Sequence, residues 1–212
     1  MNSKLKTLIF AFTLSILAPI PLAKADTAYS IKVHFLYGSR PINKYKRTER
    51  KWFGGKLGGH VGIEIDSNEI INFLPYGAVS LYPNEADPNS QFVIMNNNNF
   101  YGVLGGNPDS MKKMVIHLEI SSNQKTLLDS ITTKYLSKTP YDYAFFGMRC
   151  GSSTYDILST IGILEKFKSN KQLARRIFYP RRLRKRLLKM ANEKGWSTEI
   201  NEGFKKRKWE KD

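Results

Sequence analysis

One cysteine and one glycine-flanked histidine are the side chains of this chain whose chemistry and setting favour nucleophilic catalysis. Cys150 is the only cysteine in 212 residues, and the pattern after it predicts that it lies in the opening turn of a helix. A helix N-terminus and a nearby imidazole both lower the pKa of a thiol. His60 follows Gly58 and Gly59 and begins the strand-like run HVGIEID. The two segments predict a Cys–His pair; a buried structural cysteine is the alternative.

Asn72 supplies a third polar group for this pair. Residues 60–66 and 69–75 are apolar runs separated by Ser67 and Asn68, a pattern typical of a β-hairpin. Asn72 then lies on the returning strand, opposite the region of His60. A polar side chain at that place can hold an imidazole in one tautomer and orientation. The hairpin therefore predicts that Asn72 orients His60.

The other candidate residues favour structural interpretations. His34 and His117 lie in alternating strand patterns, as solvent-facing or hydrogen-bonded residues, and neither has cysteines or carboxylates at metal-ligand spacing. Tyr143 and Phe145 are interpreted as packing residues or pocket walls. The chain contains no P-loop, dinucleotide fingerprint or Gly-x-Ser-x-Gly elbow. We therefore expect neither a metal nor a cofactor.

The elements that must position these residues follow the order strands, then helices. Alternation predicts a strand within residues 28–38, with Ile31, Val33, Phe35 and Tyr37 on one face. Further strands are expected at 60–66, 69–75, 77–83, 91–95 and 112–120. Residues 96–110 are rich in Asn and Gly and are expected to form a loop. Helices are predicted from Ser121, from Cys150 to about residue 167, and from Pro180. This order indicates an α+β fold.

The N-terminus has the layout of a secretory signal. Two lysines precede the apolar run Leu8–Leu17, and small residues around Lys24 predict cleavage after Ala25. A membrane anchor is the alternative, but a bilayer span needs about 20 apolar residues, and Pro19 and Pro21 interrupt this segment. Residues 1–25 are therefore expected to direct export to the periplasm or the extracellular space, and no later segment could span a bilayer.

The basic charge is concentrated near the C-terminus. The chain carries a net charge of +16, and residues 165–212 hold 17 Lys/Arg against 6 Asp/Glu, a balance of +11. The helix from Pro180 could insert Leu183, Leu187 and Leu188 into a lipid surface, or pack them on the domain as an ordinary amphipathic helix. Nucleic acid would also attract such a segment, but export makes that partner unexpected. A solvated basic surface is the plainest interpretation.

Two of these segments resemble a known family. HVGIEIDSNEIIN is similar to the histidine hairpin of NlpC-type papain-like enzymes, where a polar residue follows the catalytic histidine by twelve positions, as Asn72 follows His60. PYDYAFFGMRC resembles the segment before the family's nucleophile, whose tyrosine donates to the oxyanion; the matching position is Tyr141. The histidine precedes the cysteine, as in the circularly permuted branch that includes lecithin:retinol acyltransferase-like proteins. Arg149-Cys150-Gly151 and Ala144-Phe145 depart from the family's Asp-Cys-Ser and double glycine.

The resemblance, which covers about residues 30–165, implies a papain-like antiparallel sheet packed against helices. The implied organisation is a signal peptide at 1–25, a permuted papain-like domain at 26–165 and a basic helical C-terminal extension at 166–212, in a chain expected to be a monomer. The implied catalytic residues are Cys150, His60, Asn72 and Tyr141. Cys150 would form an acyl-enzyme, with His60 as its base and general acid.

Three functions remain open on this basis. The first is an exported thiol hydrolase of amides, with cell-wall peptide as its substrate. The second uses the same residues on lipid acyl esters or thioesters, as a hydrolase or acyltransferase. The third is a non-catalytic cationic protein that binds the anionic envelope.

Overall fold

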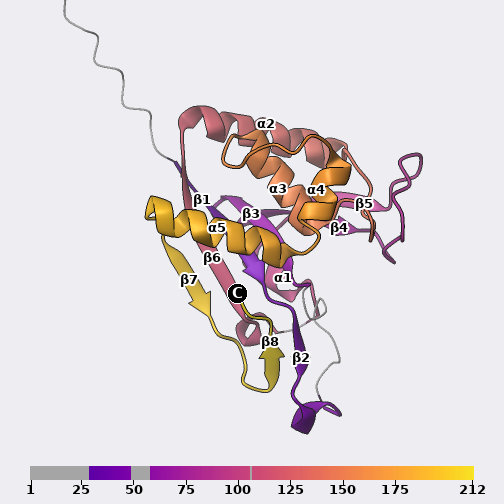
Figure 1. Ribbon diagram of the computed structural model, residues 1–212, viewed down its shortest axis with the longest axis vertical. Coiled ribbons are helices and arrows are strands. Elements are labelled where there is room, and N and C mark those ends of the chain that lie inside the picture. Colours follow the sequence, from indigo (N-terminus) through magenta and orange to yellow (C-terminus); the bar gives the residue numbers. More distant parts are fainter. Residues whose placement is uncertain (1–28, 49–57, 106) are drawn as a thin grey trace, which may run out of the picture.

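The structure is a computed structural model that describes residues 29–48, 58–105 and 107–212; the predicted signal peptide lies outside these residues. A six-stranded antiparallel sheet forms its centre and confirms the predicted α+β class (Figure 1). In spatial order its strands are β5 (Ser90–Met95), β4 (Glu69–Pro75), β3 (His60–Asp66), β1 (Tyr29–Leu36), β6 (Lys113–Ile120) and β7 (Thr198–Asn201). A separate two-stranded sheet joins β2 (Ser39–Pro41) to β8 (Arg207–Trp209).

Alternation along the strands gives the sheet two different faces. Ile31, Val33 and Phe35 of β1 are almost fully buried and, with Tyr37, belong to the main hydrophobic core, as the sequence predicts. Leu36 and Ile70 point to the opposite face and join a smaller cluster. The helices of the chain are therefore divided between two apolar surfaces of one sheet.

The main core lies between the sheet and four helices. These are α2 (Ser122–Ser137), α3 (Cys150–Thr160), α4 (Asn170–Arg176) and α5 (Pro180–Lys194), of which α3 to α5 lie in front of the sheet in Figure 1. The capping box predicted at Ser121 and Gln124 is present at the start of α2. The helix from Cys150 is shorter than expected, because the chain turns at Gly162, whose φ is 80°.

The smaller cluster contains a helix that the sequence does not predict. Within residues 96–110, expected to be a loop, the structure has α1 (Asn97–Gly102) and a 3-10 turn at Pro108–Ser110. The Asn96 side chain caps α1 by accepting from the Asn99 backbone N–H. Phe100 and Tyr101 of α1 pack on Leu36 and Ile70. Residues 77–83, expected to be a strand, make only an isolated bridge from Ser80 to Ala144.

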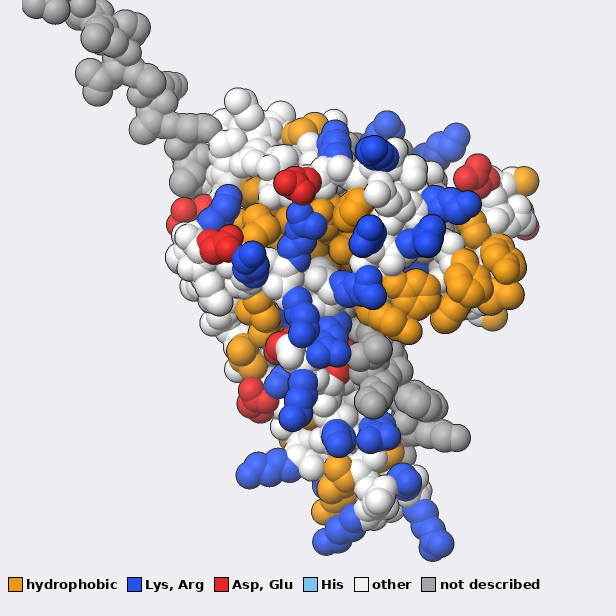
Figure 2. All heavy atoms as spheres, in the orientation of Figure 1, with side chains coloured by type: hydrophobic (Ala, Val, Ile, Leu, Met, Phe, Trp, Pro, Cys, Tyr) orange, Lys and Arg blue, Asp and Glu red, His pale blue; other side chains and the backbone are white. Residues whose placement is uncertain are grey.

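The basic C-terminal segment is part of the folded core. Leu183 and Leu187 of α5 are fully buried, β7 adds an edge strand to β6, and β8 pairs with β2. Residues 166–212 are therefore neither only helical nor a separate extension, which corrects that part of the sequence prediction. Lys and Arg side chains spread over the face that α5 covers (Figure 2). No helix within the described residues is both long enough and apolar enough to cross a membrane.

Candidate active site

Cys150 is the first residue of α3, as the sequence predicts. The helix begins here because the Ser152 hydroxyl accepts from the Arg149 backbone N–H at 2.8 Å and donates to the Arg149 carbonyl at 3.0 Å. The Arg149 guanidinium carries only donors, so it does not cap the N–H groups of the helix. Cys150 is only 4% exposed, and its thiol lies at the positive end of the helix dipole.

A glycine turn delivers His60 to the start of β3. Gly59 has a φ of 79°, and a Cβ at this position would lie 2.0 Å from the Leu36 carbonyl oxygen, so only glycine fits. Gly62, two residues further on the same face, leaves room for the Phe100 ring, which packs against the His60 ring with 5.3 Å between centroids. The imidazole is therefore buried and held on both sides by backbone geometry and packing.

Asn72 holds one nitrogen of this imidazole. It pairs with Gly62 across the hairpin, which places it diagonally from His60. The distance from His60 Nε2 to Asn72 Oδ1 is 2.9 Å. Asn72 Nδ2 donates to the Val93 carbonyl at 3.2 Å, so the amide oxygen faces the histidine. This arrangement makes Nε2 the donor and leaves Nδ1 for a second partner.

Cys150 is the other side chain that interacts with the His60 imidazole, through charge and a hydrogen-bonding contact that shift the pKa of both groups. Burial would raise the pKa of the Cys150 thiol, but the His60 charge, hydrogen bonds from His60 and Tyr143, and the Arg149 charge lower it below its ordinary value. Burial would lower the pKa of His60, but the Cys150 charge and hydrogen bonds to Cys150 and Asn72 raise it. The two shifts favour a thiolate–imidazolium pair.

The tyrosine beside the cysteine is Tyr143, not Tyr141. The Tyr143 hydroxyl donates toward Cys150 Sγ over 3.9 Å. The Tyr141 hydroxyl is buried without a hydrogen-bond partner in the described structure, and its ring packs against Phe73 and Tyr135. The structure therefore differs from the resemblance-based expectation, because the irregular segment before α3 brings the later tyrosine to the sulfur.

A cleft opens over Cys150, which we call the Cys150 cleft. Its volume is about 600 Å³. It is lined by Gly58, Gly59, His60, Leu74, Pro75, Val103, Leu104, Tyr143, Phe145, Arg149, Cys150, Phe178, Tyr179 and Pro180. Among the described residues, no Asp or Glu contributes to this lining. The cleft is thus mostly apolar, with the reactive pair and one guanidinium as its ionisable groups apart from tyrosines.

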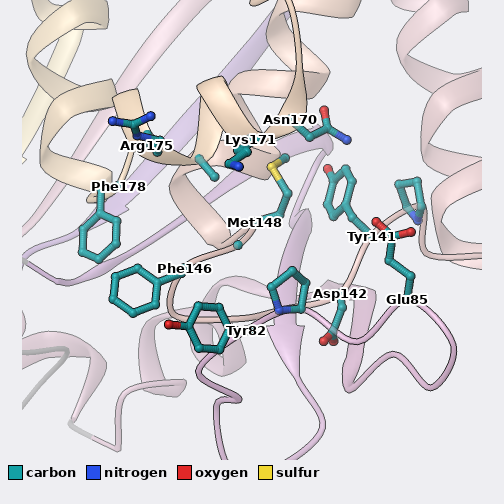
Figure 3. Close-up of a pocket in the computed structure, with 14 residues that line it drawn as sticks. Tyr82, Glu85, Tyr141, Asp142, Phe146, Met148, Asn170, Lys171, Arg175 and Phe178 are labelled. Atoms are coloured by element: carbon teal, nitrogen blue, oxygen red, sulfur yellow. The ribbon is translucent and has the colours of Figure 1, made fainter.

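A second cavity, the aromatic pocket, shares Phe178 with the Cys150 cleft. Its volume is about 590 Å³, and its walls include Tyr82, Phe146, Phe178 and Met148. Figure 3 shows these rings on one side and Lys171 and Arg175 of α4 on another. The Tyr82 and Phe146 rings pack together at 5.4 Å and are more than half exposed.

The remaining histidines lie away from the cysteine. His34 is buried, with Nε2 at 2.7 Å from Glu64 Oε2 and Nδ1 at 2.6 Å from the Tyr101 hydroxyl. His117 contacts Glu199 at 2.8 Å in the neighbouring strand. Within the part of the chain that the structure describes, no cluster of three His, Cys, Asp or Glu side chains could hold a metal.

Sequence reasoning predicted Cys150, His60 and Asn72 as site residues, and the structure brings all three together. The sequence assigns Tyr143 to packing or to a pocket wall; Tyr143 does line the cleft, and its hydroxyl also lies 3.9 Å from Cys150 Sγ. Sequence reasoning missed Phe178 and Tyr179, which reach the cleft from the connection between α4 and α5. Their aromatic pair directly before Pro180 was a usable signal. Comparisons of the chain with protein-family models, curated proteins and solved structures found no match.

Proposed function

We propose that this protein is an exported thiol hydrolase that cleaves an amide bond, with cell-wall peptide as its substrate class. One observation carries the proposal: the buried His60 side chain interacts with Cys150 while its Nε2 lies 2.9 Å from Asn72 Oδ1. A nucleophile, a base and a group that orients the base, in that order, form the basis of acyl transfer through a cysteine. The resemblance to permuted NlpC-type enzymes and the predicted signal peptide agree with it.

The proposed reaction begins with attack of the Cys150 thiolate on the substrate carbonyl carbon. A C–S bond forms and the carbonyl oxygen takes the negative charge, which the Cys150 backbone N–H and the Tyr143 hydroxyl stabilise. The His60 imidazolium then donates its proton to the leaving nitrogen as the C–N bond breaks. Water attacks the resulting thioester while His60 accepts a proton from it. The C–S bond then breaks, the acid leaves, and the Cys150 thiolate and His60 imidazolium are regenerated.

A second candidate keeps the same residues and changes the substrate to a lipid acyl ester or thioester. The aromatic pocket beside the Cys150 cleft favours it, because an acyl chain is an elongated apolar group. Burial of Leu183 and Leu187 removes the insertion of these α5 side chains as its membrane anchor. A third candidate, a cationic envelope-binding protein without catalysis, would need neither the His60–Asn72 bond nor the low thiol pKa.

The test is acylation of the mature protein by thiol-reactive acyl probes, followed by a matched substrate panel. Wild-type protein should form a covalent adduct that Cys150→Ser abolishes and His60→Ala slows by at least about 100-fold. Peptide amides and short-chain acyl esters are then compared by kcat/KM. A higher kcat/KM for the amides than for the esters supports the primary proposal. A higher kcat/KM for the esters favours the lipid candidate. If no adduct forms and no substrate is turned over, the third candidate, a non-catalytic envelope-binding protein, is supported.

A further inference from the structure

The residue before the nucleophile places an uncompensated positive charge in the Cys150 cleft. The Arg149 guanidinium stacks on the Phe178 ring at 3.5 Å and lies 5.4 Å from the Tyr179 ring centroid. Across the described residues, no carboxylate forms an ion pair with it, and Nη2 is buried without an acceptor. Buried charges normally have partners, since burial without one is costly.

Arg184, which is fully buried, has a different setting. Arg184 forms ion pairs with Glu210 and Asp212. Its Nη2, like that of Arg149, has no hydrogen-bond partner in the described structure, so the two residues differ in their counterions. Arg149 instead faces a cleft whose described lining contains no acid. The aromatic rings hold the planar Arg149 guanidinium in one orientation, but they accept no hydrogen bond from its N–H groups. Among the described residues no acceptor reaches Nη2, so a bound group could supply one.

Two structural roles do not account for this side chain. The Ser152 hydroxyl already satisfies the Arg149 backbone at the start of α3. The Arg149 charge does lower the pKa of Cys150, but its contribution follows those of His60 and Tyr143. A positive charge beside a thiolate would also need no rigid stacking on Phe178. The orientation of a guanidinium matters chiefly when its two parallel N–H groups must meet the two oxygens of a carboxylate.

We propose that Arg149 is a specificity-determining residue that binds a carboxylate of the substrate close to the scissile carbonyl. The substrate is then an acidic peptide, with the carboxylate held by the guanidinium while the Cys150 thiolate attacks the neighbouring amide. This inference rests on the proposed thiol hydrolase function and narrows its substrate class. The guanidinium matches a carboxylate in bidentate geometry, and the described walls of the cleft offer that carboxylate no repelling acid.

Two alkylating reagents test the site without a known substrate. Iodoacetate and iodoacetamide both lose iodide to the Cys150 thiolate, but only iodoacetate carries a carboxylate. The ratio of their rates at one pH is independent of the thiolate fraction, because both reagents react with the same thiolate. Arg149→Gln should lower the iodoacetate-to-iodoacetamide ratio about tenfold, the scale of one charge-assisted hydrogen bond. Lys185→Gln removes an equal charge from an exposed position on α5 and should leave the ratio unchanged.

A measurement on the wild-type protein covers the case in which Arg149→Gln does not fold. Glutarate should protect Cys150 from iodoacetamide more than glutaramide does, at constant ionic strength. Equal protection by the two compounds, or an unchanged reagent ratio in a folded Arg149→Gln variant, would overturn the carboxylate site. Stronger protection by inorganic phosphate than by glutarate would overturn it in favour of a phosphate group. None of these readouts requires amide turnover, so failure of the hydrolase proposal is detected separately by the substrate panel.

Discussion

Replacing Arg184 tests whether the basic C-terminal segment is part of the core. The guanidinium is fully buried, donates to Glu210 Oε1 at 3.0 Å, and lies 3.7 Å from the Tyr37 ring centroid. Asp212 accepts from its Nε and also from the Tyr37 hydroxyl. Arg184 of α5 therefore connects the C-terminal residues Glu210 and Asp212 to Tyr37, which follows β1.

Arg184→Met keeps most of the side-chain volume and removes the charge. It leaves the almost fully buried Glu210 carboxylate without its cation, and breaking a buried ion pair from one side costs about 3–5 kcal/mol. The pKa of Glu210 is already raised by burial, despite the Arg184 charge and hydrogen bonds that oppose the rise. Urea unfolding monitored by circular dichroism should therefore show a loss of about this size in the free energy of unfolding.

Two controls separate this pair from ordinary surface charge. Lys189→Met breaks the exposed contact with Glu193 on the same helix and should cost less than about 0.5 kcal/mol. In the double variant with Glu210→Gln, the second substitution should cost less than it does alone, because no unpaired charge remains buried. A loss for Arg184→Met no larger than that for Lys189→Met would refute the assignment of this segment to the core.

The remaining predictions concern the two histidine networks. Burial lowers the pKa of His34 to about 4 from 6.5, against the opposing Glu64 contacts, so the unfolded chain binds more protons between these values. Stability should then fall as pH decreases from about 6.5 to 4, by roughly 3 kcal/mol at most, and His34→Gln should flatten that slope in urea titrations at several pH values. Tyr143→Phe should lower kcat about 100-fold through loss of an oxyanion donor, whereas Tyr141→Phe should leave kcat unchanged; equal effects would contradict the assignment. Asn72→Ala should lower kcat/KM about 10- to 100-fold and lower the pKa of His60, as titrated by NMR, since the hydrogen bond to Asn72 raises it; an unmoved titration would exclude the orienting role.

The parts of the site that were predicted from the sequence depend on local geometry. A two-residue turn pairs Asp66 with Glu69, and an irregularity between Glu64 and Asp66 then shifts the register by one residue. After this shift Gly62 pairs with Asn72, which places Asn72 diagonally from His60. Cys150 was correctly predicted at a helix start, although the residues that follow gave a helix that was too long. The strand pattern also identified the core face of β1, because period-2 alternation depends only on one buried face.

The parts that were missed depend on contacts between distant segments. Whether Tyr141 or Tyr143 reaches the sulfur is set by the path of an irregular segment, which is held by Asp142. The Asp142 carboxylate accepts from the Asn84 and Asn89 backbone N–H groups at 2.8 and 2.7 Å. No local pattern predicts such a connection.

The C-terminal strands and α1 were missed for related reasons. β7 and β8 are short, and their partners β6 and β2 lie far away in the chain, so charge dominates their local pattern. The helix α1 is rich in asparagine, which has low helix propensity but caps helix ends well. Its stability comes from burial of Phe100 and Tyr101 against the sheet, and tertiary packing of this kind overrides propensity.

The most direct test of the central claim is the pH dependence of Cys150 alkylation by iodoacetamide, measured on a protein that spans residues 26–212 and on its His60→Ala variant. The thiol pKa is lowered by the His60 charge and hydrogen bond, acting against burial. Alkylation of the wild type should therefore begin well below the pKa of a free thiol, about 8.5. In His60→Ala, the profile should move to that value or above it, because burial then acts with less opposition. Two coincident profiles would contradict the claim that His60 activates Cys150.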